Sequence, residues 1–152
     1  MTTADISRFP VPEIKDMPKD IADRILAVQE KSGFVPNVFL VLAHRPEEFR
    51  AFFAYHDALM DKPGPITKAE REMIVVATSN ANQCQYCVVA HGAILRIRAK
   101  NPLIADQVAV NYRKADITPR QMVMIDFAMK VSARAYEVGD ADIAMLKEHG
   151  FS

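Results

Sequence analysis

Two segments of this sequence carry the residue pattern of a helix N-terminus directly before a long apolar stretch. Thr67 is followed three residues later by Glu70, and Thr118 is followed three residues later by Gln121. In each pair the threonine and the later side chain can satisfy one another's unpaired backbone N–H groups, which is called a capping box. The β-branched run 73–76 alone would also suit a strand, but the capping box ahead of it favours a buried helix.

Further helix signals occupy most of the remaining chain. Pro18 suits a first helical turn because its missing N–H would be unpaired there, and Gly33 suits the C-terminal end of the same helix. Pro46 begins another segment with helical spacing of its apolar residues, a third covers roughly 85–99, and a fourth begins near Ile104. The sequence therefore predicts several consecutive helices along most of this part of the chain.

Two more helices are expected towards the C-terminus. The apolar stretch 122–131 is expected to form the most buried helix, and a last helix is expected to run from a cap at Asp140 to a stop at Gly150. We find no internal repeat and no low-complexity segment. The fold class predicted is all-α, in a single domain over 1–152 with an extended N-terminal arm over 1–18.

Length and composition exclude several classes of protein. A chain of 152 residues is about one domain long, and its 50% hydrophobic content excludes an intrinsically disordered chain. Lysine plus arginine equals aspartate plus glutamate at 19 each, which argues against a nucleic-acid partner. No apolar run approaches the ~20 residues of a membrane-spanning helix, and the first eight residues lack the apolar core of a secretion signal. We therefore expect a cytoplasmic protein with no membrane partner.

The two cysteines of the chain lie three residues apart at an expected helix start, and His91 follows four residues after Cys87. On a helix, Cys84, Cys87 and His91 share one face, and the helix N-terminus favours a thiolate. This spacing suits a redox-active dithiol with a neighbouring base. The alternatives are a metal site and inert buried thiols, although a structural zinc site usually takes four ligands and these residues supply three.

Glu72, eleven intervening residues and then Cys84-x-x-Cys87-x-x-x-His91 resemble the signature of the AhpD-like alkylhydroperoxidase and carboxymuconolactone decarboxylase superfamily. Without that resemblance, Glu72 would suggest a solvated or capping carboxylate. Decarboxylase members lack the cysteine pair, so the resemblance implies no decarboxylase activity. Similarity to the peroxidase-related branch runs through three stretches: Phe34-Val35-Pro36-Asn37, Thr67-Lys68-Ala69-Glu70-Arg71-Glu72-Met73-Ile74 and Asn82-Gln83-Cys84-Gln85-Tyr86-Cys87-Val88-Val89-Ala90-His91-Gly92-Ala93.

The resemblance implies an AhpD-like helical bundle and a thiol-dependent peroxidase that reduces hydrogen peroxide or organic hydroperoxides. In such an enzyme Cys87 attacks the peroxide, Cys84 condenses with the resulting sulfenic acid, His91 takes the thiol proton and Glu72 orients His91. From the residues alone, the helix-start position favours Cys84 as the attacking thiol, while the proximity of His91 favours Cys87. No haem, flavin or metal is implied.

The resemblance also implies the partners: a dithiol protein or lipoyl-type carrier as reductant, and further copies of the chain in a homo-oligomer. Two departures from the family pattern stand out. Some AhpD proteins carry histidine where this chain has Tyr86, and similar members continue beyond Ser152 into further C-terminal helices. We therefore expect either a C-terminally truncated chain or one whose core is completed by a partner subunit.

The same residues are also compatible with two classes of function other than a peroxidase. Cys84, Cys87 and His91 could hold zinc in a metal-binding or redox-sensing module, which metal analysis of the reduced protein would detect. Alternatively, the chain could be a catalytically silent subunit of a helical assembly, which would form oligomers but no peroxide-dependent disulfide.

Overall fold

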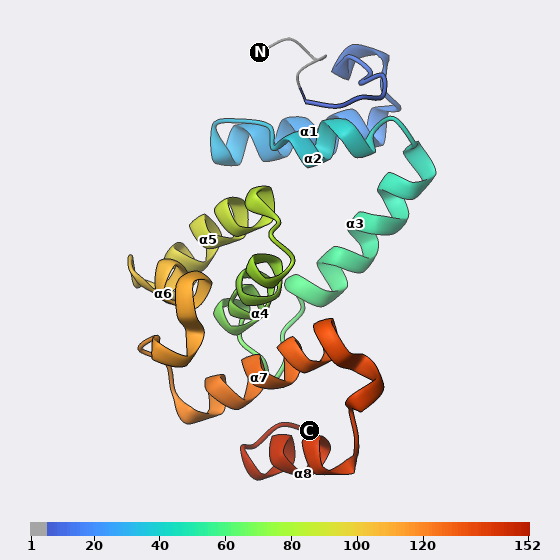
Figure 1. Cartoon of the computed structure of the whole chain (residues 1–152). Coiled ribbons are helices and arrows are strands. Elements are labelled where there is room, and N and C mark those ends of the chain that lie inside the picture. Colours follow the sequence, from blue (N-terminus) through green and yellow to red (C-terminus); the bar gives the residue numbers. More distant parts are fainter. Residues whose placement is uncertain (1–5) are drawn as a thin grey trace. The chain divides into compact units, whose positions relative to one another are not determined.

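The computed structural model describes residues 6–152, in which eight α-helices and no strand are found. The predicted all-α fold class is thus confirmed. None of the helices in the described part of the chain is both long and apolar enough to cross a membrane. The helices are α1 Lys19–Ser32, α2 Asn37–Leu42, α3 Pro46–Met60, α4 Lys68–Ala81, α5 Gln85–Ala99, α6 Ile104–Asn111, α7 Pro119–Arg134 and α8 Asp140–Glu148 (Figure 1).

Both predicted capping boxes form. The Thr67 hydroxyl accepts a hydrogen bond from the Glu70 N–H at 3.2 Å, and the Glu70 carboxylate accepts one from the Thr67 N–H at 2.8 Å. The corresponding distances for Thr118 and Gln121 are 3.2 and 3.0 Å. The run 73–76 lies inside α4, as the capping box predicted.

Three details of the sequence-based prediction are wrong. Pro18 is the N-cap of α1 and lies outside its first turn, which begins at Lys19. The helix over 122–131 is not the most buried one: α7 buries two residues, whereas α4 buries five because α5, α6 and α7 all pack against it. The last helix is capped one residue earlier than predicted. The Asp142 carboxylate accepts a hydrogen bond from the Gly139 N–H at 2.8 Å, so that Asp140 is the first helical residue.

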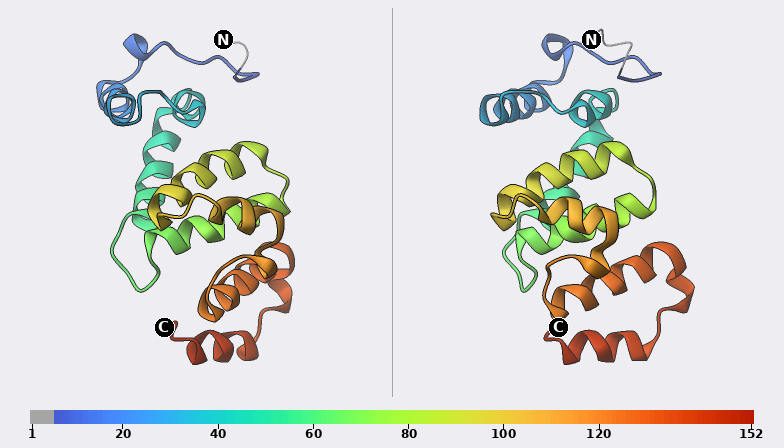
Figure 2. Two further views of the ribbon diagram at one scale, coloured as in Figure 1. Left: turned by 90° about the vertical axis from the view of Figure 1, so that its left-hand side faces the viewer. Right: turned by 60° about the vertical axis from the view of Figure 1, so that its left-hand side comes forward.

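The described residues form two compact units, one ending at Lys62 and the other running from Pro63 to Ser152. The single domain over 1–152 stays a prediction. In the second unit α4 and α5 lie side by side and run in opposite directions, joined by a short turn (Figure 2). The core of this unit consists of Met73, Val76, Ala77, Leu95, Ile104, Ala105, Val108, Met124 and Ile125.

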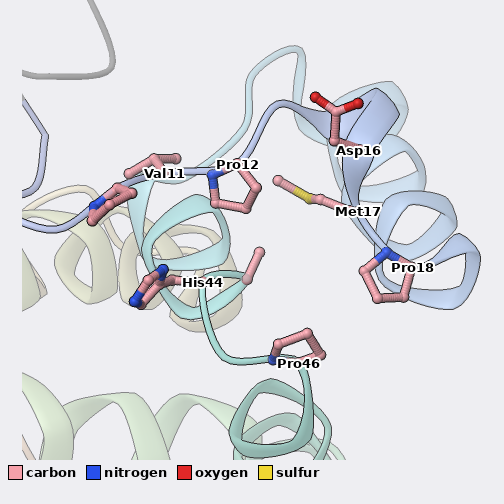
Figure 3. A pocket seen from close by; sticks show the side chains of 9 residues that line it. Val11, Pro12, Asp16, Met17, Pro18, His44 and Pro46 are labelled. Atoms are coloured by element: carbon pink, nitrogen blue, oxygen red, sulfur yellow. The ribbon is translucent and has the colours of Figure 1, made fainter.

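The first unit has its own core, in which α1, α2 and α3 contribute apolar side chains. The rings of Phe39 and Phe53 stack with centroids 4.3 Å apart. Residues 1–5 of the predicted arm lie outside the described residues, and a 3₁₀ turn over Ile14–Asp16 interrupts the rest of the arm. A hollow of about 280 Å³ lies between the arm and residues 43–46 (Figure 3).

An ion pair between α1 and α3 is expected to make the stability of the first unit depend on pH. Arg24 donates two hydrogen bonds of 3.0 Å to the Asp57 carboxylate, and they lower the pKa of Asp57 below its usual value. A carboxylate with a lowered folded-state pKa stabilises the protein above its unfolded pKa and loses that contribution as the pH falls through the folded pKa. We expect Asp57→Asn to lower the free energy of unfolding near neutral pH by up to about 1 kcal/mol.

Urea unfolding at neutral pH and at about pH 2 measures this effect, and the difference between the two proteins should shrink in acid. Asp20→Asn is the matched comparison: Arg50 also lowers the pKa of Asp20, but the two side chains are more exposed, at 57% and 47%, so this variant should show the same dependence on pH with a smaller amplitude. A difference between Asp57→Asn and the original protein that stays constant from neutral pH to acid would contradict the assignment.

Candidate active site

The turn between α4 and α5 places Cys84 at the start of a helix. Gln83 takes a left-handed backbone conformation, with φ of 55°, which few residues other than glycine adopt readily. After this turn the chain comes back onto α4, where the Cys84 N–H donates to the Ser79 carbonyl at 2.9 Å. Cys84 thereby becomes the N-cap of α5.

Cys84 and Cys87 are joined by a disulfide, and their Cα atoms lie 5.4 Å apart. The Cys84 sulfur also accepts a hydrogen bond from the Cys87 N–H at 3.3 Å. A helix N-terminus has unpaired N–H groups and the positive end of the helix dipole, both of which stabilise sulfur carrying negative charge. The predicted placement of both sulfurs on one side of the helix start is confirmed.

His91 lies one helical turn after Cys87 on α5, so both side chains project from the same face of the helix. The His91 Nδ1 atom is 2.7 Å from Oε2 of Glu72, which α4 contributes. The Glu72 side chain is 2% exposed and the His91 side chain is 27% exposed. Glu72 is therefore a buried partner of the imidazole. Without the family resemblance, its position in the sequence would have suggested a solvated carboxylate.

Arg98, which the sequence motifs did not reveal, completes this cluster. Its Nη1 atom donates to Oε1 of Glu72 at 2.8 Å, so each oxygen of the carboxylate has a nitrogen partner. His91 and Arg98 lie seven residues apart, on either side of the fully buried Leu95, and therefore both face α4. That seven-residue spacing is the one sequence signal that could have indicated the arginine.

The charges in this cluster depend on one another. A carboxylate removed from water is destabilised by several kcal/mol unless a cation and hydrogen-bond donors compensate for the lost hydration. Arg98 supplies a fixed positive charge, and His91 supplies a second donor. Removing one partner would leave a buried charge without compensation, which typically costs about 3–5 kcal/mol.

A hollow of about 330 Å³ lies against the disulfide on the side of Cys84. Cys84 lines it, whereas Cys87 and His91 do not. The other lining residues are uncharged: Asn80, Gln83, Gln85, Val88 and Val89. An uncharged group carried by another molecule could therefore approach the Cys84 sulfur without meeting a charged side chain.

No group of three or more histidine, cysteine, aspartate or glutamate side chains suited to a metal ion occurs among residues 6–152. The zinc alternative requires Cys84 and Cys87 as thiolates, and in the disulfide neither sulfur is one.

Two solved structures closely match this arrangement of helices. One, from Ralstonia eutropha JMP134, is described as an alkylhydroperoxidase AhpD core in a peroxidase-related protein. It is 71% identical, with a TM-score of 0.94, and the match covers 97% of this chain and 77% of that chain. The other, a peroxidase-related protein from Silicibacter sp. TM1040, is 37% identical with a TM-score of 0.90, over 97% and 76% of the two chains.

Weaker matches are found to sestrin-2. The Bos taurus protein is 28% identical over 87 residues, which are 56% of this chain and 18% of sestrin-2. The Homo sapiens protein is 32% identical over 62 residues, which are 41% of this chain and 13% of sestrin-2. The chain thus spans less than a fifth of the sestrins that it matches.

The sequence profile of the carboxymuconolactone decarboxylase family matches residues 46–109, which include Glu72, both cysteines and His91. Together with the two peroxidase-related structures, this match agrees with the resemblance seen in the sequence. The chain belongs to the AhpD-like carboxymuconolactone decarboxylase family.

Proposed function

We propose that the chain is a thiol-dependent peroxidase that reduces hydrogen peroxide or organic hydroperoxides through Cys84 and Cys87. The observation that carries this proposal is the disulfide at the N-terminus of α5, one turn away from an imidazole paired with a buried carboxylate. A dithiol that closes into a disulfide can deliver two electrons, which is what reduction of one hydroperoxide requires.

In the proposed reaction the Cys87 thiolate attacks the outer oxygen of the hydroperoxide. A sulfur–oxygen bond forms, the oxygen–oxygen bond breaks and the alcohol leaves after taking up a proton, so that Cys87 becomes a sulfenic acid. The Cys84 sulfur then attacks the Cys87 sulfur, the disulfide forms and water leaves. A dithiol reductant returns two electrons and two protons, which restores both thiols and leaves the reductant as a disulfide.

His91 and Glu72 are assigned to proton transfer. His91, one turn after Cys87, takes the proton of the Cys87 thiol and returns it to the departing alkoxide. Glu72 holds the ring through Nδ1 at 2.7 Å, so that the other ring nitrogen is available for this transfer. No cofactor is required by this sequence of steps.

The hollow beside the disulfide favours Cys84 as the sulfur that the reductant attacks. Cys84 lines this hollow and Cys87 does not. Attack on Cys84 releases Cys87 as the leaving thiolate, which is the form required for the next peroxide. A dithiol protein or a lipoyl-type carrier would bring a thiol to Cys84 through this hollow, and the thiolate form of that thiol would attack the Cys84 sulfur.

We further propose that the protein acts as a homo-oligomer. In the second unit several large apolar side chains are well exposed, among them Val89 at 65%, Ile97 at 76% and Val110 at 86%. Val89 and Ile97 lie on α5 and Val110 lies on α6, and these two helices pack against each other. Where such side chains form a continuous apolar surface, that surface typically binds another protein.

Steady-state consumption of tert-butyl hydroperoxide with dihydrolipoamide as reductant tests the proposed function. We expect turnover that saturates with peroxide and forms one alcohol per reductant oxidised. Metal analysis of the reduced protein is the parallel measurement for the zinc alternative. Stoichiometric zinc together with no peroxide consumption would contradict the peroxidase and support the metal site.

A further inference from the structure

His91 and Glu72 form the proposed proton relay, and Arg98 is bound to its Glu72. No step of the proposed reaction involves Arg98. It donates to Oε1 of Glu72 at 2.8 Å, while Oε2 lies 2.7 Å from Nδ1 of His91. We propose that Arg98 is a positioning residue: it keeps the Glu72 carboxylate charged and thereby fixes the ring proton of His91 on Nδ1, which leaves Nε2 free to accept a proton. This inference rests on the proposed function, in which His91 accepts the thiol proton.

The need for a cation follows from burial. The Glu72 side chain is 2% exposed, against 24% for Arg98 and 27% for His91. A carboxylate this far from water takes up a proton unless an opposite charge compensates for the lost hydration. A guanidinium stays charged at any pH at which the protein is folded, so it can supply that compensation independently of the state of the ring.

The state of the carboxylate determines where the ring carries its proton. An ionised carboxylate only accepts hydrogen bonds, so His91 must donate to it from Nδ1, and in the neutral ring Nε2 then carries no hydrogen. A protonated Glu72 could instead donate to Nδ1. The ring hydrogen would then lie on Nε2, and the ring could no longer accept a proton from a thiol at that atom.

The placement of Arg98 supports this role. Leu95 is fully buried against the core, and His91 and Arg98 lie one helical turn before and one turn after it. Because α4 and α5 run in opposite directions, Glu72 near the start of α4 faces the second half of α5. The carboxylate therefore lies between the arginine and the imidazole, and Arg98 acts through Glu72.

Nitrogen NMR of the imidazole rings in the disulfide form measures the position of this proton directly. The spectrum is recorded at about pH 8, above the ordinary imidazole pKa, and comparison with His91→Ala identifies the His91 signal among the four histidines. We expect the hydrogen on Nδ1 in the original protein. In Arg98→Met we expect it on Nε2, with kcat for peroxide reduced about tenfold or more and KM within about twofold.

Two further variants separate charge from shape. Arg98→Lys keeps the positive charge and is expected to retain the Nδ1 hydrogen and most of the activity. Arg96→Met is the matched control, because Arg96 lies on the same helix but pairs with Asp106, whose side chain is 63% exposed. It should leave both the position of the ring hydrogen and kcat unchanged.

A hydrogen on Nε2 in the original protein, or an Arg98→Met variant with unchanged tautomer and kcat, would overturn the inference. If Arg98→Met does not fold, Arg98→Gln takes its place, because glutamine keeps a hydrogen-bond donor but carries no charge: an Nε2 hydrogen supports the role of the charge, and a retained Nδ1 hydrogen overturns it. An original protein without peroxidase activity would contradict the proposed function, while the NMR measurement would still decide whether Arg98 fixes the ring hydrogen.

Discussion

Cys87→Ser is expected to lower kcat/KM for hydroperoxide by about 10³-fold or more, because a serine hydroxyl is a far weaker nucleophile than a thiolate. Cys84→Ser should behave differently. It retains the attacking sulfur but lacks the sulfur that resolves the sulfenic acid, so it should complete one turnover and then stop. Rapid-mixing measurement of peroxide loss against protein concentration distinguishes these two outcomes.

Trapping with a dione reagent that reacts with sulfenic acids is the accompanying measurement. The chain has two cysteines, so each variant has a single thiol and any trapped product can be assigned without ambiguity. A trapped product in Cys87→Ser but not in Cys84→Ser would reverse the two roles. Full steady-state turnover in both variants would contradict a dithiol cycle altogether.

The second large effect is expected at the relay. His91→Ala and Glu72→Gln should each lower peroxidase turnover by about 10²-fold, the usual scale of general acid–base catalysis. A change in the thiol pKa is too small an effect to account for such a decrease, because the gain in thiolate fraction is largely offset by a loss of nucleophilicity. A thiol with the ordinary pKa of ~8.5 is about 3% thiolate at neutral pH, and lowering that pKa to ~6 raises the fraction about thirtyfold.

The more acidic thiolate is also a weaker nucleophile. With a Brønsted slope of ~0.45, the same change of acidity reduces the intrinsic reactivity about thirteenfold. The net gain from acidifying a thiol is therefore only about twofold. Most of the effect of a relay must come from protonation of the departing oxygen and from alignment of the peroxide.

Turnover and thiolate content should be measured in the same preparations, the latter from the ultraviolet absorbance of the thiolate during a pH titration of the reduced protein. His149→Ala is the matched control, because His149 bonds to the Met145 carbonyl at 2.9 Å at an exposed position. It should leave both quantities unchanged. If turnover in His91→Ala falls only in proportion to the thiolate content, the proton relay is the wrong explanation.

Helix starts could be predicted from the sequence because capping is a local interaction. Thr67 and Glu70 lie within one turn of each other, so both hydrogen bonds of the capping box join residues that are close in the sequence. The cysteine spacing was informative for the same reason, since residues three apart at a helix start are neighbours. The left-handed conformation of Gln83 was missed because glycine is the usual sequence signal for that conformation.

Burial and the partners of Glu72 could not be predicted in this way. The apolar stretch 122–131 suggested the most buried helix, but burial depends on how many helices pack around an element, and α4 has three such neighbours. The bond between Arg98 and Glu72 joins residues 26 positions apart and depends on how α4 and α5 align. An arginine in the last turn of a helix also suits the helix dipole, and the sequence does not distinguish that role from pairing with a buried carboxylate.

Mass spectrometry of the peptide that contains residues 84–87 shows whether the two cysteines reduce a hydroperoxide. The peptide is measured before and after the reduced protein meets a stoichiometric amount of hydroperoxide. A dithiol peroxidase predicts that this peptide loses two hydrogens while the hydroperoxide is converted to alcohol and water. A peptide that keeps its mass while the peroxide persists, or that gains oxygen without losing the two hydrogens, would show that Cys84 and Cys87 do not act as a peroxidatic dithiol.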